Sequence, residues 1–131
     1  MIYEATTDGV RVRVQPDFLE DNSQPEEGAF VWSYAIEIAN VSDRRVQLLK
    51  RTWDIVDAQG NQQRVHGDGV VGEQPVLEPG EAFAYKSGVP LATASGFMRG
   101  LFHMIDEQGA PFDIEVPAFS LDSPFAAGAM H

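Results

Sequence analysis

The chain has 131 residues, no cysteine and a formal net charge of −11, from 20 acidic and nine basic side chains. The length suits one domain that buries about two thirds of its surface, and the missing cysteine excludes disulfides, thiolate metal sites and thiol catalysis. The acidic balance disfavours nucleic-acid binding, and no apolar run approaches the ~20 residues that span a bilayer, so we predict a cytoplasmic protein without membrane insertion.

Alternating apolar and polar side chains predict strands in the first half of the chain. Residues 10–18 form the first predicted strand and residues 30–38 the second, with a turn at 40–43. Residues 46–56 form a third strand, in which Leu48 and Leu49 break the alternation and indicate a bulge.

The second half continues in the same way. A short polar strand through Val65 is expected after a turn at 57–60, and Pro79-Gly80 mark another turn before a strand around 83–86. Residues 97–105 are apolar on both faces, which favours a central strand, and residues 112–116 complete a hairpin with it.

No window carries a helical apolar stripe longer than two turns, so the fold class is all-β. We predict an immunoglobulin/fibronectin type III-like β-sandwich of two antiparallel sheets with about seven to nine strands. Since the immunoglobulin disulfide is absent, the fibronectin-like form is preferred. Residues 1–121 are expected to form a single domain, and residues 122–131 a flexible C-terminal tail.

A glycine-spaced loop is the main candidate site, and it matches G-x-G-x-x-G with Gly67, Asp68, Gly69, Val70, Val71 and Gly72. A dinucleotide site needs a helix after the third glycine, but Glu73-Gln74-Pro75 follows instead, so that interpretation is rejected. Backbone N–H groups of such a loop can still bind an anion. We favour a structural role, in which the glycines allow positive φ and the two valines cap the core.

No other residues form a recognisable catalytic or metal site. His66 has Asp68 two residues on but no evident nucleophile, and His103 is read as a core or edge histidine. The acidic stretch between Asp17 and Glu27 does not fit a calcium loop and is read as solvated. The basic cluster is read in the same way and comprises Arg44, Arg45, Lys50 and Arg51. We therefore predict no catalytic residue, no metal and no cofactor.

Several motifs together resemble the ApaG family. They are HGDGVVGEQPVLEPGE at 66–81, YKSG at 85–88, GFMRG at 96–100, FDIEVPAFSL at 112–121, RTWDIVDAQGN at 51–61, and the N-terminal segments VRVRV at 10–14 and WSYAI at 32–36. The resemblance covers nearly the whole chain except the tail, and it implies a fibronectin type III-like sandwich. It also implies an association with diadenosine tetraphosphate hydrolase and a link to cobalt and magnesium tolerance. Fusions of the domain in eukaryotes imply protein binding.

Two functions are therefore expected. The first is a non-enzymatic binding or adaptor module for a protein partner of unknown identity, with a homodimer as one possibility, linked only indirectly to cobalt and magnesium tolerance. The alternative is a sensor of pyrophosphate-containing nucleotide, with or without a divalent cation, at the loop from Gly67 to Gly72. Free N–H groups in that loop would favour the sensor, and an unpaired strand edge would favour the binding module.

Overall fold

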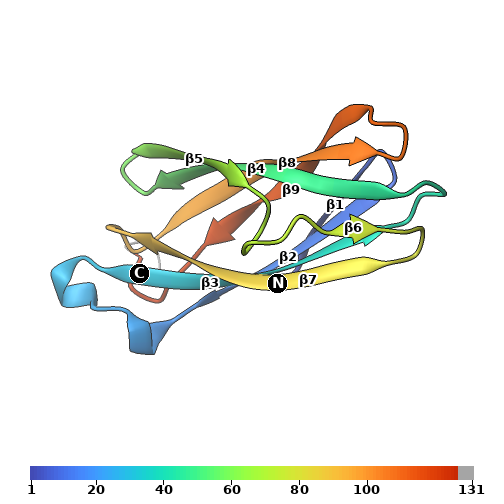
Figure 1. The fold of residues 1–131 in the computed structure, drawn as a ribbon. Helices are drawn as coiled ribbons and strands as arrows, with labels where there is room; N and C mark the ends of the chain where they lie inside the picture. The colour runs from blue at the N-terminus through green and yellow to red at the C-terminus, as the bar shows by residue number, and fades with distance from the viewer. Residues whose placement is uncertain (127–131) are drawn as a thin grey trace.

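The computed structural model describes residues 1–126 and shows two stacked antiparallel β-sheets (Figure 1). One sheet has the strand order β1-β2-β3-β7, and the other has the order β5-β4-β8-β9 with β6 paired to β4. The strands are β1 (Tyr3–Thr7), β2 (Val10–Phe18), β3 (Phe30–Asn40), β4 (Val46–Asp57), β5 (Gln62–Asp68), β6 (Val76–Leu77), β7 (Ala82–Leu91), β8 (Gly96–Asp106) and β9 (Pro111–Leu121). Two 3-10 turns, η1 (Glu20–Asn22) and η2 (Pro25–Glu27), join β2 to β3. The predicted all-β sandwich is confirmed.

The predicted bulge lies in β4. Leu48 pairs with Met104 and Lys50 pairs with His103 on β8, so Leu49 is the extra residue. The predicted central position of β8 is also confirmed, because β8 lies between β4 and β9. Neither β1 nor β6 is among the predicted strands.

The bulge decides which side chains of β4 face the core. Leu48 is buried before it, and Trp53 and Ile55 are buried after it. Leu48 and Trp53 are five positions apart, so strict alternation with no bulge would direct Trp53 outward. Thr52 therefore lies on the outer face of the five-stranded sheet.

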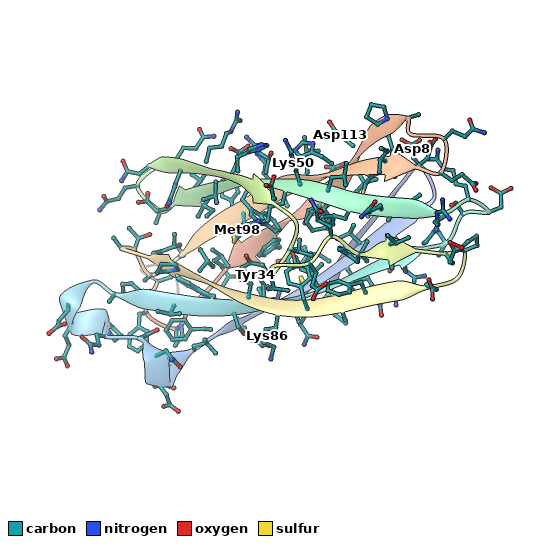
Figure 2. All side chains as sticks on the ribbon, in the orientation of Figure 1. Asp8, Tyr34, Lys50, Lys86, Met98 and Asp113 are labelled. Atoms are coloured by element: carbon teal, nitrogen blue, oxygen red, sulfur yellow. The ribbon has the colours of Figure 1, made fainter. Side chains whose placement is uncertain are left out.

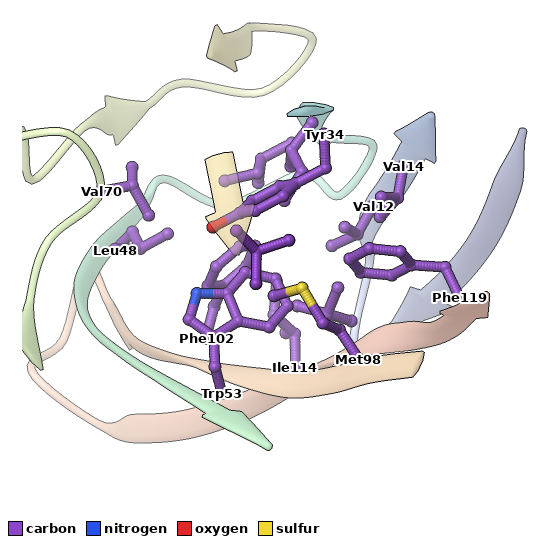
Figure 3. Close-up of a cluster of buried hydrophobic side chains, with 14 of the residues drawn as sticks. Val12, Val14, Tyr34, Leu48, Trp53, Val70, Met98, Phe102, Ile114 and Phe119 are labelled. Carbon is purple, nitrogen blue, oxygen red and sulfur yellow. The ribbon is translucent and has the colours of Figure 1, made fainter. Parts of the chain in front are cut away.

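Aromatic side chains fill the space between the sheets (Figure 3). The ring of Trp53 lies 5.5 Å from Tyr34, 6.0 Å from Phe102 and 6.2 Å from Phe119, with the ring pairs near edge-to-face. This geometry is the one that aromatic quadrupoles prefer. Phe102 has no exposed surface, and burial of these rings contributes strongly to the stability of the sandwich.

The two flanks of the sandwich differ. On one flank β1 and β9 meet: the N–H of Ser120 donates to the Tyr3 hydroxyl at 3.3 Å, and the N–H of Glu115 donates to Thr7 Oγ1 at 3.3 Å. On the other flank β7 and β5 are the outer strands of their sheets. Side-chain contacts thus tie the first flank together, while β7 ends its sheet without a further strand.

Packing continues past the last strand. Trp32 Nε1 donates to the Asp122 carbonyl at 2.8 Å, and Ser123 Oγ donates to the Ala94 carbonyl at 2.6 Å. The ring of Phe125 lies 6.0 Å from that of Phe18. The predicted tail begins at residue 122, so its first residues contact the sandwich, whereas residues 127–131 lie outside the described part of the chain.

The turn between β8 and β9 should give the protein an acid-sensitive contact. The Asp106 carboxylate accepts the N–H groups of Ala110 and Gln108, each at 2.9 Å, and these bonds hold the pKa of Asp106 below its usual range, with Arg44 adding to the effect. A depressed pKa in the folded state stabilises the protein above the ordinary pKa, and this stability is lost as pH falls through the folded value. We expect Asp106→Asn to lower the urea midpoint at neutral pH, and the difference from wild type to shrink as pH falls below the ordinary aspartate pKa of about 3.9. A constant difference at every pH would contradict this origin.

Candidate functional site

The glycine loop is a tight hairpin that leaves β5. The N–H of Val70 donates to the Glu73 carbonyl at 2.8 Å, and the N–H of Glu73 returns to the Val70 carbonyl at 2.9 Å. Val71 and Gly72 lie between them with φ of 45° and 81°. Positive φ at both central residues is the pattern of a type I′ turn, whose twist matches that of the flanking strands. The motif therefore reverses the chain direction and does not begin a helix.

Two of the loop's backbone donors are used inside the protein. The N–H of Gly69 donates to the Leu49 carbonyl at 2.8 Å, and the N–H of Val70 is bonded across the turn. An anion-binding nest needs successive N–H groups that converge on a ligand. Anion binding at this loop stays a prediction, and it would have to rely on other donors than these two.

The loop valines do not both cap the core as expected. Val70 is fully buried and belongs to the core cluster, whereas Val71 is 55% exposed at the tip of the turn. The reason is geometric, since the two central residues of a two-residue hairpin point away from the strands they join.

Arg51 of β4 lies beneath the loop. Its Nη1 donates to the carbonyls of Asp68, at 3.0 Å, and Gly69, at 2.9 Å. A Cβ at Gly67 would lie 3.0 Å from the same Nη1. Gly67 thus leaves room for the guanidinium that holds the loop, which supports a packing role for this glycine.

Two tyrosines lie near this arginine. Burial raises the pKa of the Tyr34 hydroxyl, while a hydrogen bond with Ser87 and the charge of Arg51 oppose the rise. Burial also raises the pKa of the Tyr85 hydroxyl, which is buried without a hydrogen-bond partner among the described residues. A buried hydroxyl without a partner costs free energy, so this end of the inter-sheet space is polar but incompletely paired.

Two histidines, His66 and His103, belong to a connected polar group on the protein's surface. Thr52 Oγ1 lies 2.8 Å from His66 Nδ1 and 2.7 Å from His103 Nε2. His103 Nδ1 lies 2.7 Å from Asp113 Oδ1. We call this set the histidine–threonine row. It takes one residue each from β5, β4, β8 and β9 and crosses the outer face of the sheet, where Figure 2 shows Asp113.

The row corrects two expectations. His66 pairs with the hydroxyl of Thr52 and not with Asp68, and a hydroxyl, which is a possible nucleophile, does lie beside it. His103, read as a core or edge histidine, is neither, because its side chain is 28% exposed and its strand β8 lies between β4 and β9. Thr52 and Asp113 are not among the candidate residues, since only the strand register brings them to the histidines.

A cleft of about 500 Å³ opens beside Thr52. Its lining comprises Thr52, Asp54, Arg64, Arg99, Gly100, Leu101, Glu115 and Val116. Asp54 Oδ1 accepts Arg64 Nε at 2.9 Å, and this hydrogen bond holds the pKa of Asp54 below its usual range. Two arginines and two carboxylates balance the charge of the cleft, which therefore favours neither a strongly anionic nor a strongly cationic ligand.

The acidic stretch behaves as solvated surface, but the basic cluster does so only in part, because Arg51 is hydrogen-bonded beneath the glycine loop. The acidic stretch begins at Asp17, near the end of β2, and includes the turns η1 and η2, which contain no buried residue. The basic cluster is split, since Arg44 pairs with Asp106 at 3.0 Å and Arg45 with Glu78 at 3.8 Å. Within residues 1–126, no group of three or more histidine, aspartate or glutamate side chains is arranged to hold a metal ion.

Comparison with known proteins agrees with this architecture. The ApaG domain matches residues 20–106. The chain is 54% identical to Protein ApaG of Brucella canis and to Protein ApaG of Paramagnetospirillum magneticum, in each case over 94% of this chain and 95% of the relative. The crystal structure of the ApaA protein from Bordetella pertussis superposes with a TM-score of 0.86 at 39% identity, covering 89% of this chain and 95% of that one. The protein therefore belongs to the ApaG family.

Proposed function

We propose that this protein is a non-enzymatic binding module that docks an extended segment of a protein partner along β7. The observation that carries the proposal is the position of β7, a ten-residue strand at the end of its sheet that, among the described strands, pairs with β3 alone. An outer strand offers a row of unpaired backbone groups to which another chain can add as a further strand. The shared contacts of β1 and β9 make the other flank less accessible.

Pro90 indicates which residues of β7 point their N–H groups outward. Proline has no N–H, so in a paired strand it occupies a position whose N–H would face away from the neighbour. Residues of the same parity as Pro90, namely Ala84, Lys86 and Gly88, therefore direct their N–H groups to the free edge. These are the donors that an added strand would use.

A cleft of about 520 Å³ adjoins this edge on the outer face of the four-stranded sheet. Ala35 and Ala84 are among its lining residues, and Arg13, Glu37 and Lys86 bring charges of both signs to it. Figure 2 shows Lys86 on this outer face. The cleft suits one side chain of the docked segment, because alternate side chains of an added strand fall on this face.

The test compares two variants at one position. Ala84→Pro removes an outward N–H, whereas Ala84→Ser keeps it. Both proteins, shown to be folded by circular dichroism, are used to capture partners from an extract of the source species, and captured proteins are quantified by mass spectrometry. We expect a partner that Ala84→Ser retains and Ala84→Pro loses, and calorimetry with that purified partner should show the same difference.

Equal binding to both variants would contradict the proposal. If every captured protein binds both variants equally, the β7 edge is not the docking strand. Sedimentation of the wild-type protein identifies self-association, and a dimer that Ala84→Pro disrupts would make a second copy of this chain the partner.

The family's link to cobalt and magnesium tolerance fits this proposal only indirectly. No helix among the described residues is long and apolar enough to cross a membrane, and we propose that any effect on these cations passes through the bound partner.

A further inference from the structure

The hydrogen bonds of the histidine–threonine row follow one consistent direction. The Asp113 carboxylate can only accept, so His103 Nδ1 carries the proton of their 2.7 Å bond. In a neutral imidazole the other nitrogen is then an acceptor, and the Thr52 hydroxyl donates to His103 Nε2 at 2.7 Å. Since that hydroxyl has one proton, His66 Nδ1 donates to Thr52 Oγ1 across their 2.8 Å contact.

This order of acid, imidazole and hydroxyl has a chemical consequence. A hydroxyl becomes a useful nucleophile when a base within hydrogen-bond reach takes its proton and a third group orients that base. Here His103 is the base for Thr52, and Asp113 fixes its tautomer and stabilises the imidazolium that forms. A threonine that only fills an outward strand position needs no such partners.

We propose that Thr52 is an acyl-acceptor site for activated carboxylic esters. Its Oγ1 attacks the carbonyl carbon, the Oγ1–carbon bond forms, and the bond from that carbon to the leaving oxygen breaks. The hydroxyl proton passes to His103 Nε2 and then to the departing oxygen, which leaves as an alcohol or phenol. The product is a threonine ester on β4, so the step is a single self-modification and does not depend on partner binding at β7.

The cleft beside Thr52 gives the ester a place to bind. Gly100 and Leu101 form part of its wall, and Leu101 is 39% exposed, so an acyl group can pack on an apolar surface next to the hydroxyl. The opposed charges of Arg64 and Asp54 are already paired. An uncharged ester therefore suits the cleft better than a polyanion.

The experiment incubates the full chain with p-nitrophenyl acetate and follows both products. We expect release of p-nitrophenolate together with one acetyl group on the peptide that contains Thr52, located by peptide mass spectrometry. Thr52→Ser should keep the label and Thr52→Val should lose it. His103→Gln should slow labelling of Thr52 about 100-fold, as expected for loss of a general base, and Asp113→Asn at least about ten-fold.

The controls separate this reaction from general acetylation. Lys50 is exposed on the same strand, so its acetylation serves as an internal reference for an unassisted amine. Thr6→Val, at an exposed position of β1, should change nothing. Thermal unfolding checks that each variant is folded. Labelling of Lys50 with Thr52 unlabelled would overturn the proposal, and so would labelling of Thr52 at an unchanged rate in His103→Gln.

Discussion

Replacing Gly69 with valine is expected to lower the free energy of unfolding by at least about 3 kcal/mol. A Cβ at this position would lie 2.3 Å from the Glu73 carbonyl oxygen, and the residue has a φ of +63°, which β-branched side chains avoid. The short contact and the positive φ both involve backbone atoms, so no side-chain rotation relieves them. Urea unfolding followed by circular dichroism measures the change.

Gly72 is the matched control for this prediction. Its φ is +81°, but a Cβ at this position would meet no atom of a non-neighbouring described residue within 4 Å. Gly72→Val therefore has only the conformational cost of a side chain at positive φ, about 1 to 2 kcal/mol. Equal losses at the two positions would show that the close approach to Glu73 does not matter. Ligand binding at this loop is better tested with Val71→Glu, because Val71 is exposed and its replacement adds negative charge without strain on Gly69.

Asn40→Leu is expected to destabilise the protein by about 3 to 5 kcal/mol. Asn40 has no exposed surface, and its Nδ2 donates to the carbonyls of Arg44, at 2.7 Å, and Leu77, at 2.9 Å. Its Oδ1 accepts the N–H of Ser42 at 3.0 Å and the Ser42 hydroxyl at 2.6 Å. Leucine fills the volume but leaves these carbonyls with fewer donors in a place that water reaches poorly.

Asn61→Ala provides the comparison for Asn40. Asn61 also makes a hydrogen bond within a turn, in which its Nδ2 donates to Asp57 Oδ2 at 3.1 Å, but its position is exposed. Its loss should cost less than about 1 kcal/mol, because water replaces the missing partner. A small effect at Asn40 would mean that the carbonyls of Arg44 and Leu77 find other donors. Denaturant midpoints of both variants distinguish these outcomes.

Periodicity predicted the strands where burial follows one face. In β2 the side chains of Val10, Val12 and Val14 are fully buried, and the alternation was unambiguous. β1 was missed although Asp8 and Gly9, with φ of 49° and 79°, form the hairpin turn that precedes β2. An Asp-Gly pair is a strong hairpin signal and would have identified this strand.

The candidate site was less predictable than the fold, for a physical reason. The glycine motif was visible in the sequence, but its hydrogen bonds depend on the conformation of the turn. The histidine–threonine row joins residues from four strands, and Thr52 and His103 are 51 positions apart. Their contact needs the register of β4 with β8, which shifts at Leu49. Alternation alone cannot specify that register.

The bulge and the glycine hairpin are coupled through one atom. Leu49, the extra residue of β4, uses its carbonyl to accept the N–H of Gly69 at 2.8 Å and Gln74 Nε2 at 3.0 Å. An insertion or deletion at either place would therefore remove hydrogen bonds at the other. A chain that lacks Leu49 loses the acceptor that holds the hairpin, and a chain with a shorter hairpin leaves the Leu49 carbonyl without its donors. Divergent sequences should gain or lose the two irregularities together, and a loop graft into another sandwich must transfer both.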